Sequence, residues 1–317
     1  VALDIAFAGI CHSDIHQARQ DWGPSLYPMV PGHEIVGRVR DIGTAVTKFM
    51  VGDLIGVGIY IDTCRTCPNC LGGLQQYCEN GNTPTYNGYE RDGTTIAFGG
   101  YSNHFVVYEN YALHVPENLP LAGVAPLLCA GITLYSPLMH WKVQSRTKVG
   151  IIGLGGLGHM GVKFAKALGA HVTVFSHSPG KEADAMIMGA DEFVVTRNLS
   201  ALKSYARKFD LLLNTVSAEM DINSYLRLLK LDGTLVVIGL PTTPYSVGVG
   251  VLLSPSRSMA GSQVGGIPEI QEMLNFASKH NIVSDVEIIN AEYANTAYER
   301  TIASDVKYRF VIDASSF

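Results

Sequence analysis

Residues Lys148-Val149-Gly150-Ile151-Ile152-Gly153-Leu154-Gly155-Gly156-Leu157-Gly158 indicate the fold of this chain. The stretch starts as an apolar run typical of a buried strand. It continues as G-x-G-x-x-G, directly before a segment with helical periodicity. In that context Gly153 permits a tight turn, Gly155 lets the backbone approach a pyrophosphate, and Gly158 allows close packing of helix on strand. The start of the helix offers free N–H groups to the phosphates. A turn without a ligand is the alternative interpretation. The motif predicts a dinucleotide site formed by Gly153, Gly155, Gly156, Leu157 and Gly158.

The residues after this motif alternate between strand and helix patterns. Apolar runs predict strands at 149–152, 171–175, 193–195, 211–214 and 235–239, with helical patterns at 180–189, 200–208 and 220–230. Such alternation is typical of a parallel sheet covered by helices on both faces. We therefore expect an α/β domain with a doubly wound parallel sheet in this half of the chain.

The loop after the second predicted strand distinguishes NAD from NADP. An NAD site places an acidic residue there to bind the ribose 2′-hydroxyl, but no Asp or Glu lies between His171 and Lys181. Hydroxyl donors and a cation suit a 2′-phosphate instead. A solvated polar loop is the alternative interpretation. We predict NADP(H) as the cofactor, with binding residues Ser176, His177, Ser178 and Lys181.

Composition and charge exclude several classes of protein. The 317 residues are 47% hydrophobic and 16% charged, which excludes a disordered chain. The net charge is −5 without any block of Lys and Arg, so nucleic acid is not expected as a partner. No apolar run reaches the ~18 residues of a membrane span, and no signal-peptide pattern opens the chain. These observations predict a cytoplasmic protein without membrane association.

The segments 1–125 and 266–317 have other sequence patterns than the strand–helix alternation that follows the glycine motif. Residues 1–125 are rich in Gly, Val and Ile, and short apolar runs at 34–39, 54–58 and 101–107 are separated by turns. This pattern predicts a β-rich domain. Residues 266–317 predict a helix at 268–279 and a strand at 308–313.

Four of the six cysteines lie close together, as Cys64-x2-Cys67-x2-Cys70-x7-Cys78. Four thiolates in one short loop suit a closed, structural zinc site. Iron–sulfur motifs also use C-x2-C-x2-C, but their fourth cysteine follows sooner and precedes proline, whereas Cys78 precedes Glu79. Disulfides are the other alternative. The spacing favours structural zinc.

The other two cysteines suggest a second metal site. Cys11 lies in Gly-Ile-Cys-His-Ser-Asp, His33 in Pro-Gly-His-Glu, and Cys129 in Leu-Leu-Cys-Ala-Gly. Two thiolates and one imidazole leave a fourth position open, which is the catalytic zinc arrangement. Glu34 is a candidate neighbour or transient ligand, and Asp14 a candidate acceptor for the second ring N–H of His33. The alternative is that these residues are ordinary core cysteines and a lone histidine, because spacing does not show that they meet.

Taken in order, these motifs resemble the zinc-dependent medium-chain alcohol dehydrogenases. The resemblance rests on 9–16, 31–34, the four cysteines, 128–133 and 153–158, and it covers essentially the whole chain. The cinnamyl alcohol dehydrogenase branch, with its bacterial aldehyde reductases, is the most similar. The resemblance implies an α/β protein with a GroES-like β-rich catalytic domain over 1–129, to which 266–317 return. It also implies a Rossmann NADP-binding domain over 130–265.

The resemblance also implies two zinc ions per chain. The catalytic ion would be held by Cys11, His33 and Cys129, with Glu34 near it. The structural ion would be held by Cys64, Cys67, Cys70 and Cys78.

Further roles follow from matching positions in the family. Ser13 would take the proton of the alcohol and His16 would carry it toward solvent. Thr133 would lie beside the nicotinamide, and Val216, Gly239 and Ser262 would line the coenzyme cleft. Trp22, Tyr60 and Phe98 are candidate walls of the substrate pocket, with core or loop aromatics as the alternative.

The implied function is interconversion of primary alcohols and aldehydes, aromatic (cinnamyl) or medium aliphatic, by hydride transfer with NADP(H). An NAD-dependent polyol or formaldehyde dehydrogenase and a non-catalytic NADP-binding protein are the alternatives. An electron-transfer iron–sulfur protein is a third alternative. The family usually pairs Rossmann sheets edge to edge, so we expect a homodimer, here through 258–264, and some bacterial members are tetramers.

Overall fold

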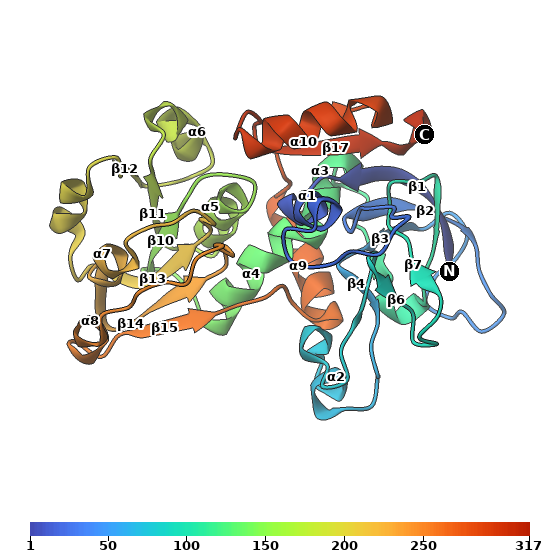
Figure 1. The fold of residues 1–317 in the computed structure, drawn as a ribbon, viewed down its shortest axis with the longest axis horizontal. Helices are drawn as coiled ribbons and strands as arrows, with labels where there is room; N and C mark the ends of the chain where they lie inside the picture. The colour runs from blue at the N-terminus through green and yellow to red at the C-terminus, as the bar shows by residue number, and fades with distance from the viewer. The chain divides into compact units, whose positions relative to one another are not determined.

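A computed structural model describes the backbone of residues 1–317 and every side chain except that of Leu199. The chain divides into two compact units, drawn in Figure 1. The first unit comprises Val1–Ile132 and Val264–Phe317, and the second comprises Thr133–Gln263. The sequence placed the corresponding boundaries at 129/130 and 265/266.

The second unit is built on a sheet whose neighbouring strands pair in parallel, in the order β12-β11-β10-β13-β14-β15. The strands are β10 (Lys148–Ile152), β11 (His171–Ser176), β12 (Glu192–Val195), β13 (Phe209–Asn214), β14 (Leu229–Val237) and β15 (Ser258–Gly261). The order reverses direction at β10, so the glycine motif that follows β10 lies at the point where ligands bind in such sheets.

Helices connect these strands. They are α4 (Ala130–His140), whose first residues belong to the first unit, α5 (Gly158–Ala167), α6 (Glu182–Ile187), α7 (Ile222–Leu226) and α8 (Val249–Leu253), with 3-10 helices at Pro179–Lys181 and Leu199–Tyr205. The α5 helix packs against β10 and β11 because Met160, Val162 and Phe164 are fully buried. All of the predicted strands are present.

Two predicted helices differ in the structure. The segment 200–208 forms the 3-10 helix Leu199–Tyr205, which ends before β13 begins at Phe209. The segment 220–230 forms only α7, which begins after Asp221 caps the backbone N–H of Asn223. The chain then enters β14 at Leu229, which pairs with Phe209. The apolar pair Leu228-Leu229 is fully buried in the sheet core, and this packing overrides the local helical pattern.

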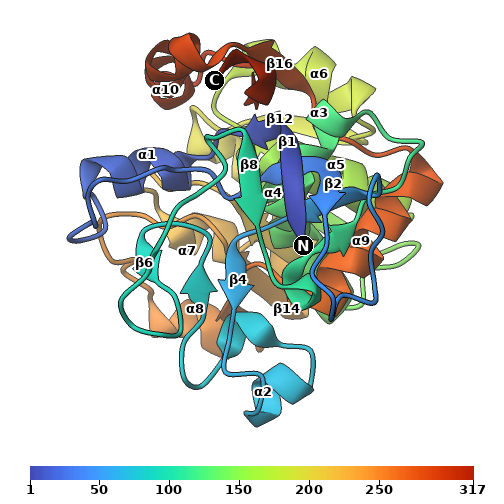
Figure 2. The same ribbon diagram turned by 90° about the vertical axis from the view of Figure 1, so that its right-hand side faces the viewer.

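The first unit contains a sheet in the order β16-β17-β1-β2-β3-β9, with β8 pairing with β1. Figure 2 shows β1 between β8 and β2. The strands are β1 (Ala2–Gly9), β2 (Ile35–Asp41), β3 (Leu54–Val57), β8 (His104–Val106), β9 (Leu113–His114), β16 (Val286–Ile289) and β17 (Arg309–Asp313). Because β17 pairs antiparallel with β1, the C-terminal segment completes this sheet. The sequence did not predict β16.

Short elements surround this sheet. Two further pairs are β4 (Tyr60–Asp62) with β5 (Thr83–Pro84), and β6 (Gly88–Tyr89) with β7 (Ile96–Ala97). The α-helices are α1 (His12–Arg19), α2 (Pro68–Leu71), α3 (Leu121–Val124), α9 (Ile267–His280) and α10 (Ala294–Ile302), and 3-10 helices lie at Gln75–Tyr77, Glu109–Tyr111, Ala125–Leu128, Ala291–Tyr293 and Ala314–Ser316. The segment that carries α2 projects away from β1 and β2 (Figure 2).

In the described residues no single helix is long and apolar enough to cross a membrane. One bent pair, Leu121–Leu128 with Ala130–His140, meets the criterion by length and composition only. Leu127, Leu128, Ile132 and Leu134 in this pair are fully buried inside the protein.

Two glycines of the motif allow folding and ligand binding to be tested separately. A Cβ on Gly158 would lie 2.0 Å from the carbonyl oxygen of Gly153, whereas a Cβ on Gly155 would meet no described atom within 4 Å. Gly158→Ala should lower the free energy of unfolding by about 1–3 kcal/mol, measured by thermal or urea unfolding. Gly155→Ala should unfold as the parent does but lose dinucleotide affinity, because its methyl group occupies the space left for a ligand. An unchanged stability of Gly158→Ala would contradict this interpretation of the turn.

Candidate active site

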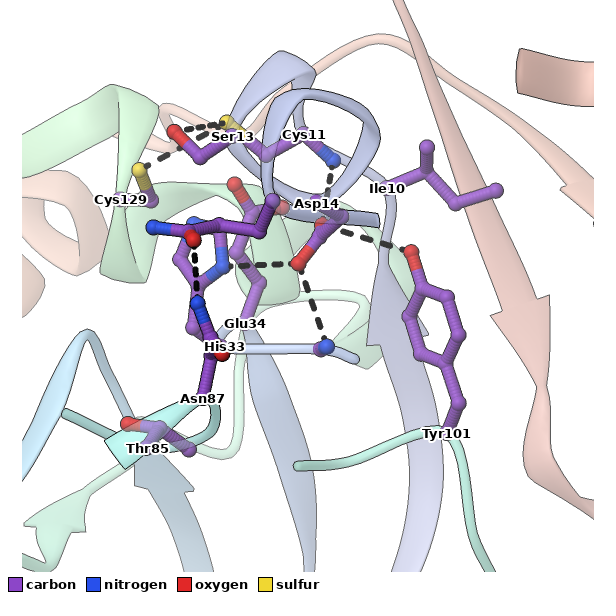
Figure 3. Close-up of polar contacts among 12 residues, drawn as sticks. Ile10, Cys11, Ser13, Asp14, His33, Glu34, Thr85, Asn87, Tyr101 and Cys129 are labelled. Carbon is purple, nitrogen blue, oxygen red and sulfur yellow. Dashed lines mark hydrogen bonds and ion pairs between the residues drawn. The ribbon is translucent and has the colours of Figure 1, made fainter. Parts of the chain in front are cut away.

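Four side chains from distant parts of the sequence converge in the first unit (Figure 3). Cys11 follows β1, His33 and Glu34 precede β2, and Cys129 follows the 3-10 helix Ala125–Leu128. One ligand atom from each residue lies within 4.8 Å of the others. We call these four residues the cysteine–histidine cluster. The structure thus brings together the three residues predicted for the open metal site.

Backbone pairing of β1 with the start of β2 builds this cluster. The N–H of Gly9 donates to the carbonyl oxygen of Glu34 at 2.9 Å, which places Cys11 beside His33. Gly9 also makes room for the acidic side chain, since a Cβ there would lie 2.0 Å from Glu34 Oε2. A glycine at this position is therefore a steric requirement of the cluster.

The spacing of the two thiols suits a tetrahedral zinc ion. Two sulfur ligands at ~2.3 Å from zinc, separated by the tetrahedral angle, lie ~3.8 Å apart. The Sγ atoms of Cys11 and Cys129 are 4.0 Å apart. A hydrogen bond from Cys129 lowers the pKa of the Cys11 thiol well below its usual value, against the effect of burial. The same interaction raises the pKa of Cys129. The protein alone therefore favours one thiolate, and a bound dication would favour two.

Asp14 orients the imidazole of His33. Its Oδ1 lies 3.0 Å from His33 Nδ1 and accepts the backbone N–H of Gly32 at 3.1 Å. Its Oδ2 accepts the backbone N–H of Cys11 at 2.9 Å and the hydroxyl of Tyr101 at 3.3 Å (Figure 3). Burial lowers the pKa of His33, but the Asp14 carboxylate and Cys11 together outweigh burial, and the pKa is raised. The predicted contact between Asp14 and His33 is therefore confirmed. Because Nδ1 is engaged in this contact, Nε2 is the ring nitrogen left for a metal.

Glu34 forms a buried ion pair with Arg309, a residue that the sequence did not single out. Arg309 Nη2 lies 2.5 Å from Glu34 Oε1 and also donates to the carbonyl oxygen of Ile10 at 2.8 Å. Burial raises the pKa of Glu34 to about 7, against the lowering effect of Arg309. The other oxygen, Oε2, is buried without a hydrogen-bond partner among the described atoms. Within the cluster, this carboxylate oxygen therefore has a free lone pair. The sequence feature that could have indicated this role is the position of Arg309, a positively charged residue inside the apolar run 308–313.

The two residues predicted for proton transfer are on α1. Ser13 Oγ lies 3.6 Å from Cys11 Sγ. His16 lies 2.8 Å, through Nδ1, from Asp21 Oδ2 and stacks on Trp22 with ring centroids 4.8 Å apart. No direct hydrogen bond joins Ser13 and His16 in the part of the chain that the structure describes. Ser13 is therefore next to the cluster, and His16 is at the solvent side of the helix with 30% of its side chain exposed.

The three aromatic residues predicted for the substrate pocket have different surroundings. Trp22 and Phe98 are exposed, at 43% and 44%. Tyr60 is a core residue, 2% exposed, and its hydroxyl donates to the carbonyl oxygen of Gly265 at 2.8 Å. It packs in the hydrophobic cluster of the β-rich unit, which agrees with the core alternative rather than with a free pocket wall.

The four-cysteine lobe, residues Cys64–Cys78, brings its sulfur atoms together. All four lie within 4.8 Å of one another, and Cys64 Sγ is 3.8 Å from Cys70 Sγ. All four cysteines are free thiols, which excludes the disulfide alternative in this structure. Backbone N–H groups of Cys64, Cys67 and Cys70 donate to sulfur atoms of the set. Such N–H···S bonds favour thiolates, and the set fits a closed tetrahedral zinc site.

Residues predicted for the coenzyme cleft meet at the carboxyl ends of the second unit's strands. A Cβ on Gly153 would lie 2.8 Å from Val216 Cγ2, and one on Gly239 would lie 2.4 Å from the carbonyl oxygen of Val216. Gly153, Val216 and Gly239 follow β10, β13 and β14. Ser262 follows β15, and its N–H donates to the carbonyl oxygen of Val237. Thr133 is buried on α4.

The loop predicted to select NADP(H) is partly engaged in its own hydrogen bonds. Ser176 is buried, and its Oγ accepts the N–H of Ser178 at 3.2 Å. Lys181 Nζ donates to the carbonyl oxygen of Leu154 at 2.8 Å, which ties this loop to the glycine motif. His177 is exposed. No acidic residue enters the loop before Glu182, in agreement with a site for a 2′-phosphate.

Comparison with known proteins identifies the family. Residues 1–117 match the alcohol dehydrogenase GroES-like domain, and residues 156–279 match the zinc-binding dehydrogenase domain. The chain belongs to the zinc-dependent alcohol dehydrogenase family and is an oxidoreductase. These matches confirm the predicted family and the fold class, a GroES-like domain with a Rossmann domain.

Individual relatives narrow the branch. The NADP-dependent alcohol dehydrogenase C 1 of Mycolicibacterium smegmatis is 55% identical over 317 residues, 100% of this chain and 90% of the relative. The aldehyde reductase YahK of Escherichia coli is 50% identical, covering 99% and 90%. The crystal structure of the Helicobacter pylori cinnamyl alcohol dehydrogenase complexed with NADP(H) superposes with a TM-score of 0.93 at 42% identity, covering 100% and 91%. The predicted cinnamyl alcohol dehydrogenase and aldehyde reductase branch is confirmed.

The two cysteine sets predict a metal content. Protein purified without chelators should contain about two zinc ions per chain, measured by elemental mass spectrometry. The reason is that one set supplies four thiolates and the other supplies two thiolates and an imidazole. Cys129→Ser and Cys64→Ser should each retain about one ion, and Ser13→Ala should retain both. One ion in the parent would contradict the assignment of the cysteine–histidine cluster.

The buried pair Glu34–Arg309 should matter far more for stability than an exposed one. Arg309→Met leaves the Glu34 carboxylate buried and uncompensated, so the free energy of unfolding should fall by about 3–5 kcal/mol in denaturant titrations. The control Arg19→Met breaks the exposed pair with Glu299 and should cost less than about 1 kcal/mol. Equal effects of the two substitutions would refute this ranking.

Proposed function

We propose that this chain is an NADP(H)-dependent alcohol dehydrogenase that interconverts primary alcohols and aldehydes at the cysteine–histidine cluster. The observation that carries the proposal is the convergence of Cys11, His33 and Cys129, with Asp14 orienting the imidazole. Relatives named as an NADP-dependent alcohol dehydrogenase and an aldehyde reductase support it. Aromatic, cinnamyl or medium aliphatic aldehydes are the proposed substrate class, with the exposed rings of Trp22 and Phe98 as candidate contacts.

The residues of the cluster have distinct tasks in this proposal. Cys11, His33 and Cys129 would hold zinc, and a zinc ion there would supply Lewis acidity toward the substrate oxygen. Asp14 keeps the Nδ1 proton of His33 in place and so presents Nε2 to the site. Arg309 holds Glu34 through Oε1, which leaves Oε2 as a carboxylate oxygen that can exchange into the site.

Proton movement uses α1. The Ser13 hydroxyl lies beside Cys11, where it can accept the proton of an alcohol and donate one to a carbonyl oxygen. His16 takes the proton onward, because its ring is partly exposed and bonded to Asp21. Since the structure has no direct Ser13–His16 hydrogen bond in its described residues, we propose that a further hydroxyl or water bridges the two. Bound NADP(H) would provide the hydride chemistry.

The second unit binds the coenzyme in this proposal. The glycines of 153–158 accept the pyrophosphate at the start of α5, where the position of Gly155 leaves open space. Ser176, His177, Ser178 and Lys181 bind the adenosine 2′-phosphate. Thr133, Val216, Gly239 and Ser262 line the cleft toward the nicotinamide. The two units are the proposed catalytic and coenzyme domains.

The four-cysteine lobe has a structural role in this proposal, with its zinc holding the loop closed. The proposed assembly is a homodimer through β15, or a tetramer. It is supported by the position of β15 at the edge of its sheet, where β14 is its only partner among the described strands. A cytoplasmic location stays a prediction.

The coenzyme proposal is tested by comparing kcat/KM for NADPH and NADH with the same aldehyde. We expect at least a tenfold preference for NADPH, because the loop 171–181 offers hydroxyls and a cation and no acidic side chain. A tenfold preference for NADH would instead favour the NAD-dependent polyol or formaldehyde dehydrogenase.

The catalytic proposal is tested by separating turnover from coenzyme binding. Cys129→Ser and His33→Ala should lower turnover by at least a thousandfold, while the Kd for NADPH, measured by its fluorescence, stays within threefold. The reason is that both residues belong to the first unit and the glycine motif to the second. Near-normal turnover in either variant would leave the non-catalytic NADP-binding protein, or another site, as the better account.

A further inference from the structure

The loop after β12 lies beside the loop proposed to bind the 2′-phosphate. In the parallel pairing of β11 with β12, Ser176 is aligned with Val195. The backbone N–H of Thr196 donates to the carbonyl oxygen of Ser176 at 2.9 Å. Arg197 then reaches across, and its Nε donates to the carbonyl oxygen of His177 at 3.0 Å. The guanidinium is thus tied to the backbone of the predicted phosphate loop.

The rest of the Arg197 guanidinium is available for a ligand. The side chain belongs to an exposed residue, and Nη1 and Nη2 form no hydrogen bond or ion pair with any residue that the structure describes. A guanidinium has five N–H donors in a planar fork, and Nε uses one of them here. The bond to His177 fixes the position of the fork while leaving its two terminal nitrogens to bind.

The residues predicted from sequence are more constrained. Lys181 donates to Leu154, and the Ser176 hydroxyl is buried and accepts the N–H of Ser178. A 2′-phosphate carries about two negative charges and three acceptor oxygens, which match a guanidinium fork better than a single ammonium. No acidic side chain lies at 171–181 to pair with the guanidinium instead.

We propose that Arg197 is a specificity-determining residue that binds the 2′-phosphate of NADP(H). The inference rests on the proposed function and extends it to the strand after the predicted loop. Lys181 belongs to the loop after β11 and Arg197 to the loop after β12, so that two segments each supply a cation to the phosphate. Stacking of the guanidinium on the adenine is the competing arrangement, and it would strengthen NADP and NAD binding alike.

The test uses two probes that differ only in the phosphate, 2′,5′-ADP and 5′-AMP, with Kd measured by calorimetry on the full chain. Arg197→Gln should weaken 2′,5′-ADP at least tenfold and change 5′-AMP less than twofold. Arg197→Lys should retain part of the preference. The matched control is Arg146→Gln, which removes the same charge from an exposed residue two positions before β10, at the opposite ends of the strands, and should change neither Kd.

Each other outcome overturns the proposal in a different way. If Arg197→Gln weakens the binding of both probes equally, Arg197 either contacts the adenine or maintains the shape of the loop. No loss for 2′,5′-ADP would remove Arg197 from the site. If the parent binds both probes equally, the NADP preference of the proposed function fails, and the role of Arg197 fails with it.

Discussion

The geometry of the cysteine–histidine cluster depends on the antiparallel pairing of β1 with two of its neighbours, β2 and β17. The last residue of β1, Gly9, donates to Glu34, and the next residue, Ile10, donates to Phe310 of β17. These two backbone bonds place Cys11 between the segment that carries His33 and the segment that carries Arg309. Cys129 reaches the same point from the end of the 3-10 helix Ala125–Leu128. Cys11 and His33 are therefore positioned by backbone hydrogen bonds at the ends of the strands, and Cys129 by the end of a helix, which suits a site that must hold one geometry.

The excess of acidic groups over basic groups explains why a bound cation would stabilise this cluster. The buried thiol of Cys129, the half-buried thiol of Cys11 and the buried carboxylates of Asp14 and Glu34 gather at this site, and Arg309 is the guanidinium paired with Glu34. The hydrogen bond with Cys11, together with burial, raises the pKa of Cys129, and burial raises the pKa of Glu34 to about 7. A divalent cation would allow both thiols to ionise. The protein alone leaves one buried carboxylate oxygen unpartnered, which is costly unless a positive charge is near it.

The fold and the four-cysteine lobe were largely predictable from sequence because they depend on local patterns. The glycine motif, the apolar runs of the parallel sheet and the spacing of Cys64, Cys67, Cys70 and Cys78 each have a physical meaning. The meeting of Cys11 with Cys129, 118 positions away, was implied only by the family resemblance, because spacing does not bring such distant residues together. Arg309 was not predictable, since its partner Glu34 is 275 positions away. The burial of Tyr60 was also not predictable from sequence, because an aromatic residue fits a core and a pocket wall equally well. The short α7 shows the same limit, since the core packing of Leu228 and Leu229 ends a pattern that locally favours helix.

Coenzyme selection shows why residue type alone is an incomplete guide. The run Ser176–Lys181 has the hydroxyls and the cation that a 2′-phosphate requires. However, Ser176 and Lys181 already form hydrogen bonds within the protein, with Ser178 and Leu154. Those bonds give the loop its shape, and a shaped loop binds at lower entropic cost than a flexible one. The carbonyl of His177 then becomes an anchor for Arg197 from the adjacent strand. In a parallel sheet, the carboxyl ends of neighbouring strands lie together, so residues about twenty positions apart share one surface. Selectivity at such an edge is therefore a property of two loops, and a sequence motif confined to the first loop captures only part of it.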